Sequence, residues 1–130
     1  MEYIYYLTNA SLTLRVVERL LGVTQQLPLE FITVIHQING WIVKVKLHDS
    51  VGRQAQQDFS AFLSEIGTAY EPCIRVRMAL WGLEMGQSAV DVMRRYQVAV
   101  VSHGKPDRTE IEEFREQFVT GLGYCPETLA

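Results

Sequence analysis

Two strand-forming segments on either side of Asn39-Gly40 constrain the fold of this chain more than any other feature. Asn-Gly favours a type I′ turn, because both central residues of that turn need positive φ. Placing the pair at the turn predicts a hairpin over residues 32–47. Its facing pairs are Ile38 with Trp41, His36 with Val43, Val34 with Val45 and Ile32 with Leu47.

Side chains alternate between the two faces of a strand, so this register also assigns the faces of the hairpin. The first face is apolar apart from one imidazole and carries Ile32, Val34, His36, Ile38, Trp41, Val43, Val45 and Leu47. The second face is mixed and carries Thr33, Ile35, Gln37, Ile42, Lys44, Lys46 and His48. We therefore expect the first face to lie against helices.

The length and composition of the chain fit one domain over residues 1–130. A chain of 130 residues buries enough surface for an independent core, and 48% hydrophobic with 21% charged residues excludes a disordered chain. The first residues lack the basic and small-residue pattern of a signal peptide, and no apolar run has the length of a bilayer span. These features predict a soluble, cytoplasmic protein.

The order of elements before residue 82 predicts the fold class. Residues 3–7 are aromatic and β-prone, and helical spacing follows from Leu14 to Leu21 after N-cap candidates at Thr8, Asn9 and Ser11. A second helix after the hairpin is expected to start at Asp49 or Ser50 and to end at Gly67. Its apolar stripe comprises Ala55, Phe59, Phe62 and Ile66.

Pro72 precedes an alternation of Ile74, Val76, Met78 and Leu80, which predicts a strand over residues 74–81. The chain is therefore predicted to be α+β, with a ferredoxin-like βαββαβ antiparallel sheet over residues 1–81 and its helices on one face. Residues 82–130 are predicted to form an α-β-α extension packed on this core. Its helices are expected after the capping-box patterns at Ser88 and Asp107, and its strand over residues 97–102.

A basic sheet face is the first candidate binding surface. If the strands 41–48 and 74–81 share one sheet, Lys44, Lys46, Arg75 and Arg77 point away from the core, together with Ile35, Ile42 and Trp81. Cations interleaved with apolar groups fit an anionic metabolite, a nucleic-acid strand or an acidic partner. The alternatives are a solvated face, or one covered by the extension or by a second subunit.

Two further features could carry chemistry. His36 interrupts the apolar face, where burial lowers the pKa of an imidazole, so it is a candidate switch or simply a satisfied core-edge histidine. A junction with Ser102, His103, Lys105 and Arg108 is predicted between a strand end and a helix start, where backbone N–H groups favour an anion. The alternative for this junction is an ordinary polar connection.

Residues 3–80 resemble an ACT-type regulatory domain. The resemblance lies in a strand, a helix after a small-residue turn, a hairpin and a second helix, represented here by residues 12–21 and 31–47. It implies sensing of an amino acid or another small ligand at a dimer interface. Because Asn9-Ala10-Ser11 stands where that family has a glycine, the resemblance assigns no binding residue.

The topology is also similar to RNA-recognition domains, whose first-strand motif is echoed by residues 4–9. The predicted register, however, places Trp41 on the helix side, whereas a stacking aromatic residue needs the open face.

These observations lead to one preferred function, one alternative, and a third possibility, which is a small enzyme with His36 or His103 as its acid/base. The preferred function is a non-enzymatic regulatory or protein-interaction module that acts as a homodimer, with sensing of a small anionic ligand as one form of it. The alternative is a nucleic-acid-binding domain that uses the basic face, although the net charge of −3 argues against non-specific binding. No catalytic residue, cofactor or metal ligand is predicted, and Cys73 and Cys125 are expected to be free thiols.

Overall fold

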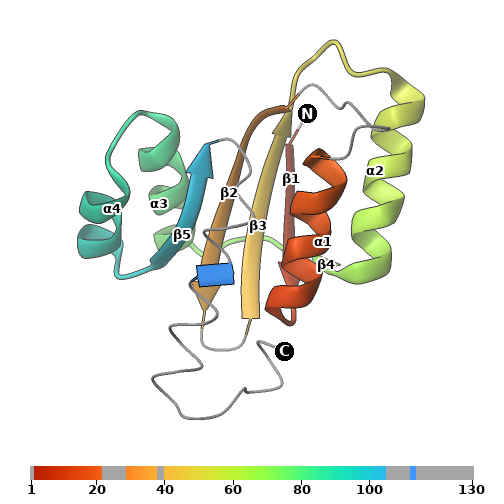
Figure 1. The fold of residues 1–130 in the computed structure, drawn as a ribbon. Helices are drawn as coiled ribbons and strands as arrows, with labels where there is room; N and C mark the ends of the chain where they lie inside the picture. Colours follow the sequence, from red (N-terminus) through yellow and green to blue (C-terminus); the bar gives the residue numbers. More distant parts are fainter. Residues whose placement is uncertain (1, 22–28, 38–39, 105–111, 114–130) are drawn as a thin grey trace.

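The computed structural model describes residues 2–21, 29–37, 40–104 and 112–113, which form an α+β structure around an antiparallel sheet (Figure 1). The strand order within the described residues is β4-β1-β3-β2-β5. The strands are β1 (Glu2–Leu7), β2 (Leu29–Gln37), β3 (Gly40–Leu47), β4 (Thr68–Ala69) and β5 (Ala99–Gly104). The helices are α1 (Ala10–Leu21), α2 (Arg53–Ile66), α3 (Ile74–Glu84) and α4 (Ala89–Tyr96).

The predicted hairpin is present as the antiparallel pair β2–β3, but its predicted register is wrong by two residues. His36 pairs with Trp41, and Gln37 pairs with Gly40. Gly40 is needed for a close approach rather than for the turn, because a Cβ there would lie 2.7 Å from the carbonyl oxygen of Leu7. A two-residue shift leaves the described side chains of β2 and β3 on their predicted faces, since the period of a strand is two. Residues 38 and 39 lie outside the described residues.

The first face of the sheet carries the larger core, as predicted. The strands contribute apolar side chains to it, including Val34 and Trp41, and α1 and α2 cover them with Val17, Phe59 and Leu63. Asn9 begins α1 as expected: its Oδ1 accepts a hydrogen bond from the backbone N–H of Leu12 at 2.9 Å.

The start of α2 differs from the prediction, whereas its end agrees. The N-cap of α2 is Gly52, without a side-chain cap, and not Asp49 or Ser50. The helix ends at Gly67 as predicted, where the backbone N–H donates to the carbonyl oxygen of Leu63.

The strand predicted over residues 74–81 is wrong, because these residues form α3. The same segment carries a helical pattern, in which Val76, Ala79, Leu80 and Leu83 recur at spacings of three, one and three. These four side chains are buried against Ile35 and Ile42 of the sheet. The alternation of apolar residues and the helical spacing coexist in this segment, and burial of the second sheet face favours the helix.

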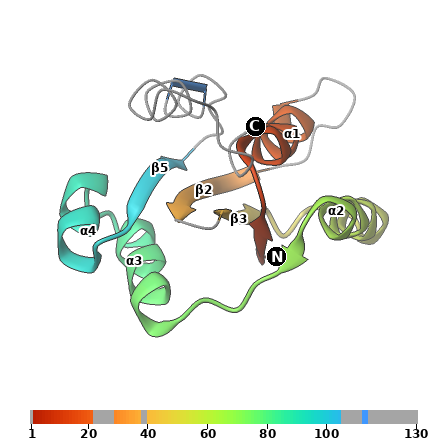
Figure 2. The ribbon, with the colours of Figure 1, turned by 90° about the horizontal axis from the view of Figure 1, so that it is seen from below.

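Because α3 is a helix, the sheet has helices on both faces rather than on one. Figure 2 shows α1 and α2 on one side of the strands and α3 and α4 on the other. The fourth strand is instead the two-residue β4, which pairs with β1. The helix α3 also crosses the predicted boundary between residues 81 and 82.

The two elements after α3 match the predicted extension in kind. Ser88 caps α4, since its Oγ accepts a hydrogen bond from the backbone N–H of Asp91 at 3.1 Å. The strand β5 then pairs with the free edge of β2. The helix expected after Asp107 lies outside the described residues. Within the part of the chain that the structure describes, no helix combines the length and the apolar character needed to cross a membrane.

Candidate functional site

The four cations of the predicted basic face do not share an open surface. Lys44 does lie on the second sheet face, but α3 covers it and leaves the residue 8% exposed. Its ammonium group pairs with Glu84 of α3 and lies 3.7 Å from the carboxylate of Glu2. Arg75 and Arg77 are exposed on α3 instead of a strand. The basic sheet face is therefore corrected to a covered face that is crossed by an ion pair.

Lys46 is the least covered lysine of the predicted face. Its side chain is 37% exposed, and its ammonium group lies 3.5 Å from the carboxylate of Glu30. A pair this exposed contributes little to stability, because water screens it. Lys46 is therefore paired with an acidic neighbour on the adjacent strand.

A polar row crosses three strands beneath α3. His103 of β5 pairs with Thr33 of β2, and Thr33 pairs with Lys44 of β3. The hydroxyl oxygen of Thr33 lies 2.6 Å from Nδ1 of His103, and Glu84 faces the row from α3. Each described polar group here is engaged with another one, as buried polar groups usually are. The row therefore holds α3 to the sheet.

The predicted junction of Ser102, His103, Lys105 and Arg108 is only partly described. Ser102 and His103 lie within β5 and not after it, and Ser102 is 5% exposed. Lys105 and Arg108 lie outside the described residues. The hydroxyl group of Ser102 is thus buried in the sheet, and anion binding by this junction stays a prediction.

Burial lowers the pKa of both sheet histidines. The pKa of His36 is lowered by desolvation alone, as the sequence predicted, and its ring packs edge-on against Trp41 with 4.8 Å between centroids. The pKa of His103 is also lowered, mainly by desolvation and in part by the charge of Lys44, although Glu84 opposes the shift. Both rings are therefore held preferentially in the neutral form.

We expect the stability of the fold to decrease in weak acid through these histidines. A lowered pKa in the folded state means that the unfolded chain binds more protons as the pH falls. The stabilisation is complete above about pH 6.5, the unfolded value, and is lost as the pH falls through the folded value. Between about pH 7.5 and about pH 5.5, the urea midpoint should decrease more for the wild type than for His103→Gln. Equal decreases in the two proteins would refute the contribution of His103.

A cleft of about 410 Å³ opens between α3 and the start of β1. Its lining contains two cations, three carboxylates and five other residues: Lys44, Arg77, Glu2, Glu71, Glu84, Ile4, Tyr70, Pro72, Leu80 and Trp81. Carboxylates outnumber cations, and Lys44 is already paired with two of them. The cleft therefore does not favour an anionic ligand.

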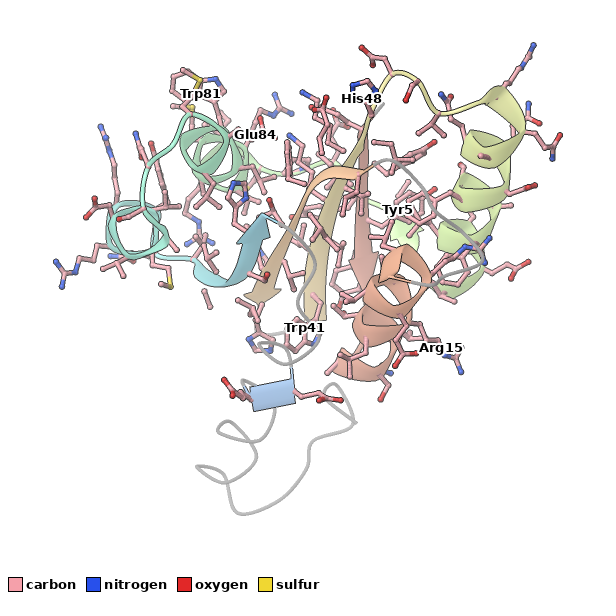
Figure 3. The ribbon with its side chains drawn as sticks, turned by 45° about the horizontal axis from the view of Figure 1, so that its top comes forward. Tyr5, Arg15, Trp41, His48, Trp81 and Glu84 are labelled. Carbon is pink, nitrogen blue, oxygen red and sulfur yellow. The ribbon has the colours of Figure 1, made fainter. Side chains whose placement is uncertain are left out.

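The outer side of α3 carries the largest apolar exposure in the described structure. Ile74 is 78% exposed, Met78 41%, Trp81 53% and Met85 66%. We call these four residues the outer row. They recur at spacings of four, three and four, so Ile74, Met78 and Trp81 share one face of α3 opposite the buried face, and Met85 continues the row at the C-cap. Figure 3 shows Trp81 on the side of α3 that is turned away from the strands.

The outer row was not identified from the sequence, although Trp81 was named there as a binding residue. The signal that could have found it is the helical spacing from Ile74 to Met85. Large apolar side chains that are exposed together on one face mark a site of interaction more often than scattered ones do. The outer row and the adjoining cleft are therefore the candidate functional site.

The described residues offer no obvious metal site. No group of three or more His, Cys, Asp or Glu side chains among them is placed to hold a metal ion. Cys73 is a free, exposed thiol at the N-cap of α3.

Comparisons with known proteins found a structural likeness. No protein-family model matches the chain, and no curated protein matches it. The chain is similar to a solved structure described as the crystal structure of the C-terminal domain of YpbH, with 15% sequence identity and a TM-score of 0.49. The match covers 87% of this chain and 97% of that one. A likeness at this level carries no argument about function.

Proposed function

We propose that this chain is a non-enzymatic regulatory or protein-interaction module that recognises a protein through the outer row of α3. The observation that carries the proposal is the exposure of Ile74, Met78, Trp81 and Met85 on one helix face. Leaving these side chains in water forgoes about 1.5–3 kcal/mol for each large one that could be fully buried. Tryptophan and methionine are also enriched at the centres of protein interfaces.

The interior polar groups support a binding role over catalysis. Thr33 is 1% exposed, Lys44 8% and Ser102 5%, so a substrate has little access to them. His103 is the most accessible member of the polar row, and its Nδ1 is engaged by Thr33. Thr33 and His103 join β2 to β5, and Lys44 of β3 joins the sheet to α3 through Glu84.

The main support for the nucleic-acid-binding alternative was the predicted basic sheet face, and α3 covers that face. A surface that follows a phosphate backbone needs several free cations on one side. Lys44 is buried and paired, whereas Arg75 and Arg77 flank an apolar row on α3. The described structure offers no observation that favours this function over protein binding.

We also infer that residues 2–69 are a ferredoxin-like unit with a very short fourth strand. The order β4-β1-β3-β2 and the two helices on one face support this inference. We likewise propose a relation to ACT-type regulatory domains and a cytoplasmic location. In an ACT-like unit of this form, α3, α4 and β5 would be an addition that covers the second face.

Site-specific photo-crosslinking in the native cell tests the proposed function. A benzophenone amino acid replaces Met78 in one variant and Asp58, which is exposed on α2, in the matched control. We expect the probe at position 78 to give defined adducts with protein, either another protein or a second copy. The control position should give few adducts. Equal adduct patterns from the two positions, or none from position 78, would contradict the proposal.

A further inference from the structure

We propose that the partner of the outer row is a second copy of this chain, bound with the two α3 helices antiparallel across a two-fold axis. This inference rests on the proposed function and specifies the partner. Three observations carry it: the symmetry of the outer row, the positions of two charges beside it, and the place of α3 on the outside of the molecule (Figure 2).

The outer row is symmetric about its own midpoint. Ile74 and Met85 lie equally far from the midpoint, which falls between Ala79 and Leu80, and so do Met78 and Trp81. An antiparallel two-fold pair therefore places Ile74 against the partner's Met85, and Met78 against the partner's Trp81. Each contact occurs twice. Thioether sulfur near an aromatic ring is a favourable contact, so the centre of the interface is complementary to itself.

The charges beside the row favour the antiparallel arrangement. Arg77 and Glu84 are two turns apart on the flank of α3 that lines the cleft, and Arg75 lies on the other flank. In an antiparallel two-fold pair, equal flanks meet. Arg77 then comes beside the partner's Glu84, offset by about 3 Å along the axis. The Arg77 side chain is 61% exposed and lies 4.0 Å from the carboxylate of Glu71, and the Glu84 side chain is 22% exposed and pairs with Lys44. The contact across the dimer would therefore extend ion pairs that both residues already make.

A parallel pair of α3 helices would bring charges of the same sign together. Opposite flanks meet in a parallel two-fold arrangement, so Arg77 would lie beside the partner's Arg75. Two neighbouring guanidinium groups repel each other, and Glu84 would have no cation of the partner beside it. The sequence of α3 therefore selects the antiparallel arrangement. Because a single eleven-residue helix is a small interface, we expect a dissociation constant on the order of 10 µM.

A charge-pairing experiment tests both the dimer and its register. Sedimentation equilibrium would measure the full-length chain, the variants Met78→Glu and Trp81→Lys, and an equal mixture of the two variants. Each single variant should weaken the dimer about 30-fold or more, as loss of a central contact does. Both positions are exposed, so the variants should fold, which circular dichroism would check.

The mixture should recover the dimer as a heterodimer. One of its two central contacts pairs the glutamate introduced in one chain with the lysine introduced in the other, and the second contact keeps the original Met78 and Trp81. In a parallel pair, positions 78 and 81 would each face their own copy. The mixture would then relieve the like-charge contacts of the single variants but form no direct contact between the glutamate and the lysine, so its recovery should stay well below wild-type strength. Dimerisation of both single variants at wild-type strength would overturn the inference, because the dimer would then use another surface; the proposed function would be decided by the crosslinks from position 78. A wild-type chain that is monomeric at about 1 mM would overturn only the inference, since crosslinks from position 78 to another protein would remain.

Discussion

Replacing Leu80 by glutamate is expected to lower the free energy of unfolding by about 4 kcal/mol or more, whereas Met78→Glu should change it by less than about 0.5 kcal/mol. Leu80 is 2% exposed between α3 and the sheet, and Met78 is 41% exposed on the outer row. The first substitution removes a buried side chain and places a carboxylate without a partner in its position. The second places the carboxylate in water.

Urea denaturation, at a protein concentration well below the expected dissociation constant, measures this difference. If Leu80→Glu does not fold, Leu80→Ala provides a milder form of the test with an expected loss of about 3 kcal/mol. In the strand predicted from the sequence, residues 78 and 80 share a face and would respond alike. Equal losses at the two positions would therefore contradict the helical assignment of residues 74–84.

Removing Lys44 alone is expected to have the next largest effect. Lys44→Met should lower the free energy of unfolding by about 2–3 kcal/mol. The variant fills the same volume but leaves the carboxylate of Glu84 against the covered sheet face without its cation. The loss should be smaller than the about 3–5 kcal/mol of a fully buried pair, because the Glu84 side chain is 22% exposed.

The double variant Lys44→Met/Glu84→Gln separates the charge from the packing. With both charges removed, the net loss should be below about 1 kcal/mol, because apolar and neutral groups replace a costly pair. Urea denaturation of the four proteins completes a double-mutant cycle. Additive losses would show that Lys44 and Glu84 do not interact, and would contradict the polar row as the link between α3 and the sheet.

The hairpin shows how far sequence patterns determine local structure. The alternation of residues 32–47 correctly assigned the two faces, because burial separates apolar from polar side chains with a period of two. It did not determine the pairing, since Asn39-Gly40 suggested a turn that would need Gly40 outside the strand. Gly40 lies inside β3, where it allows Leu7 of β1 to approach. That requirement comes from a strand far away in the sequence.

Residues 74–84 show why the candidate site could not be predicted. The segment supports both a period of two and a helical period, and the choice depends on what covers Ile35 and Ile42. The predicted strand placed Arg75 and Arg77 on a sheet face, and the outer row was therefore not identified. Only the tertiary structure shows that Lys44 is covered by α3 and that Trp81 faces solvent.

Thiol labelling at position 78 tests most directly whether the outer row of α3 is a surface that another protein molecule covers. Met78→Cys in a Cys73→Ser/Cys125→Ser background provides a single reporter, and Val76→Cys serves as the buried reference. We predict rapid labelling at 78 in dilute protein, at least about 100-fold faster than at 76, and a marked decrease at 78 as the protein is concentrated. Slow labelling at 78 in dilute protein would contradict this prediction, as would a rate that neither concentrated protein nor native-cell extract changes.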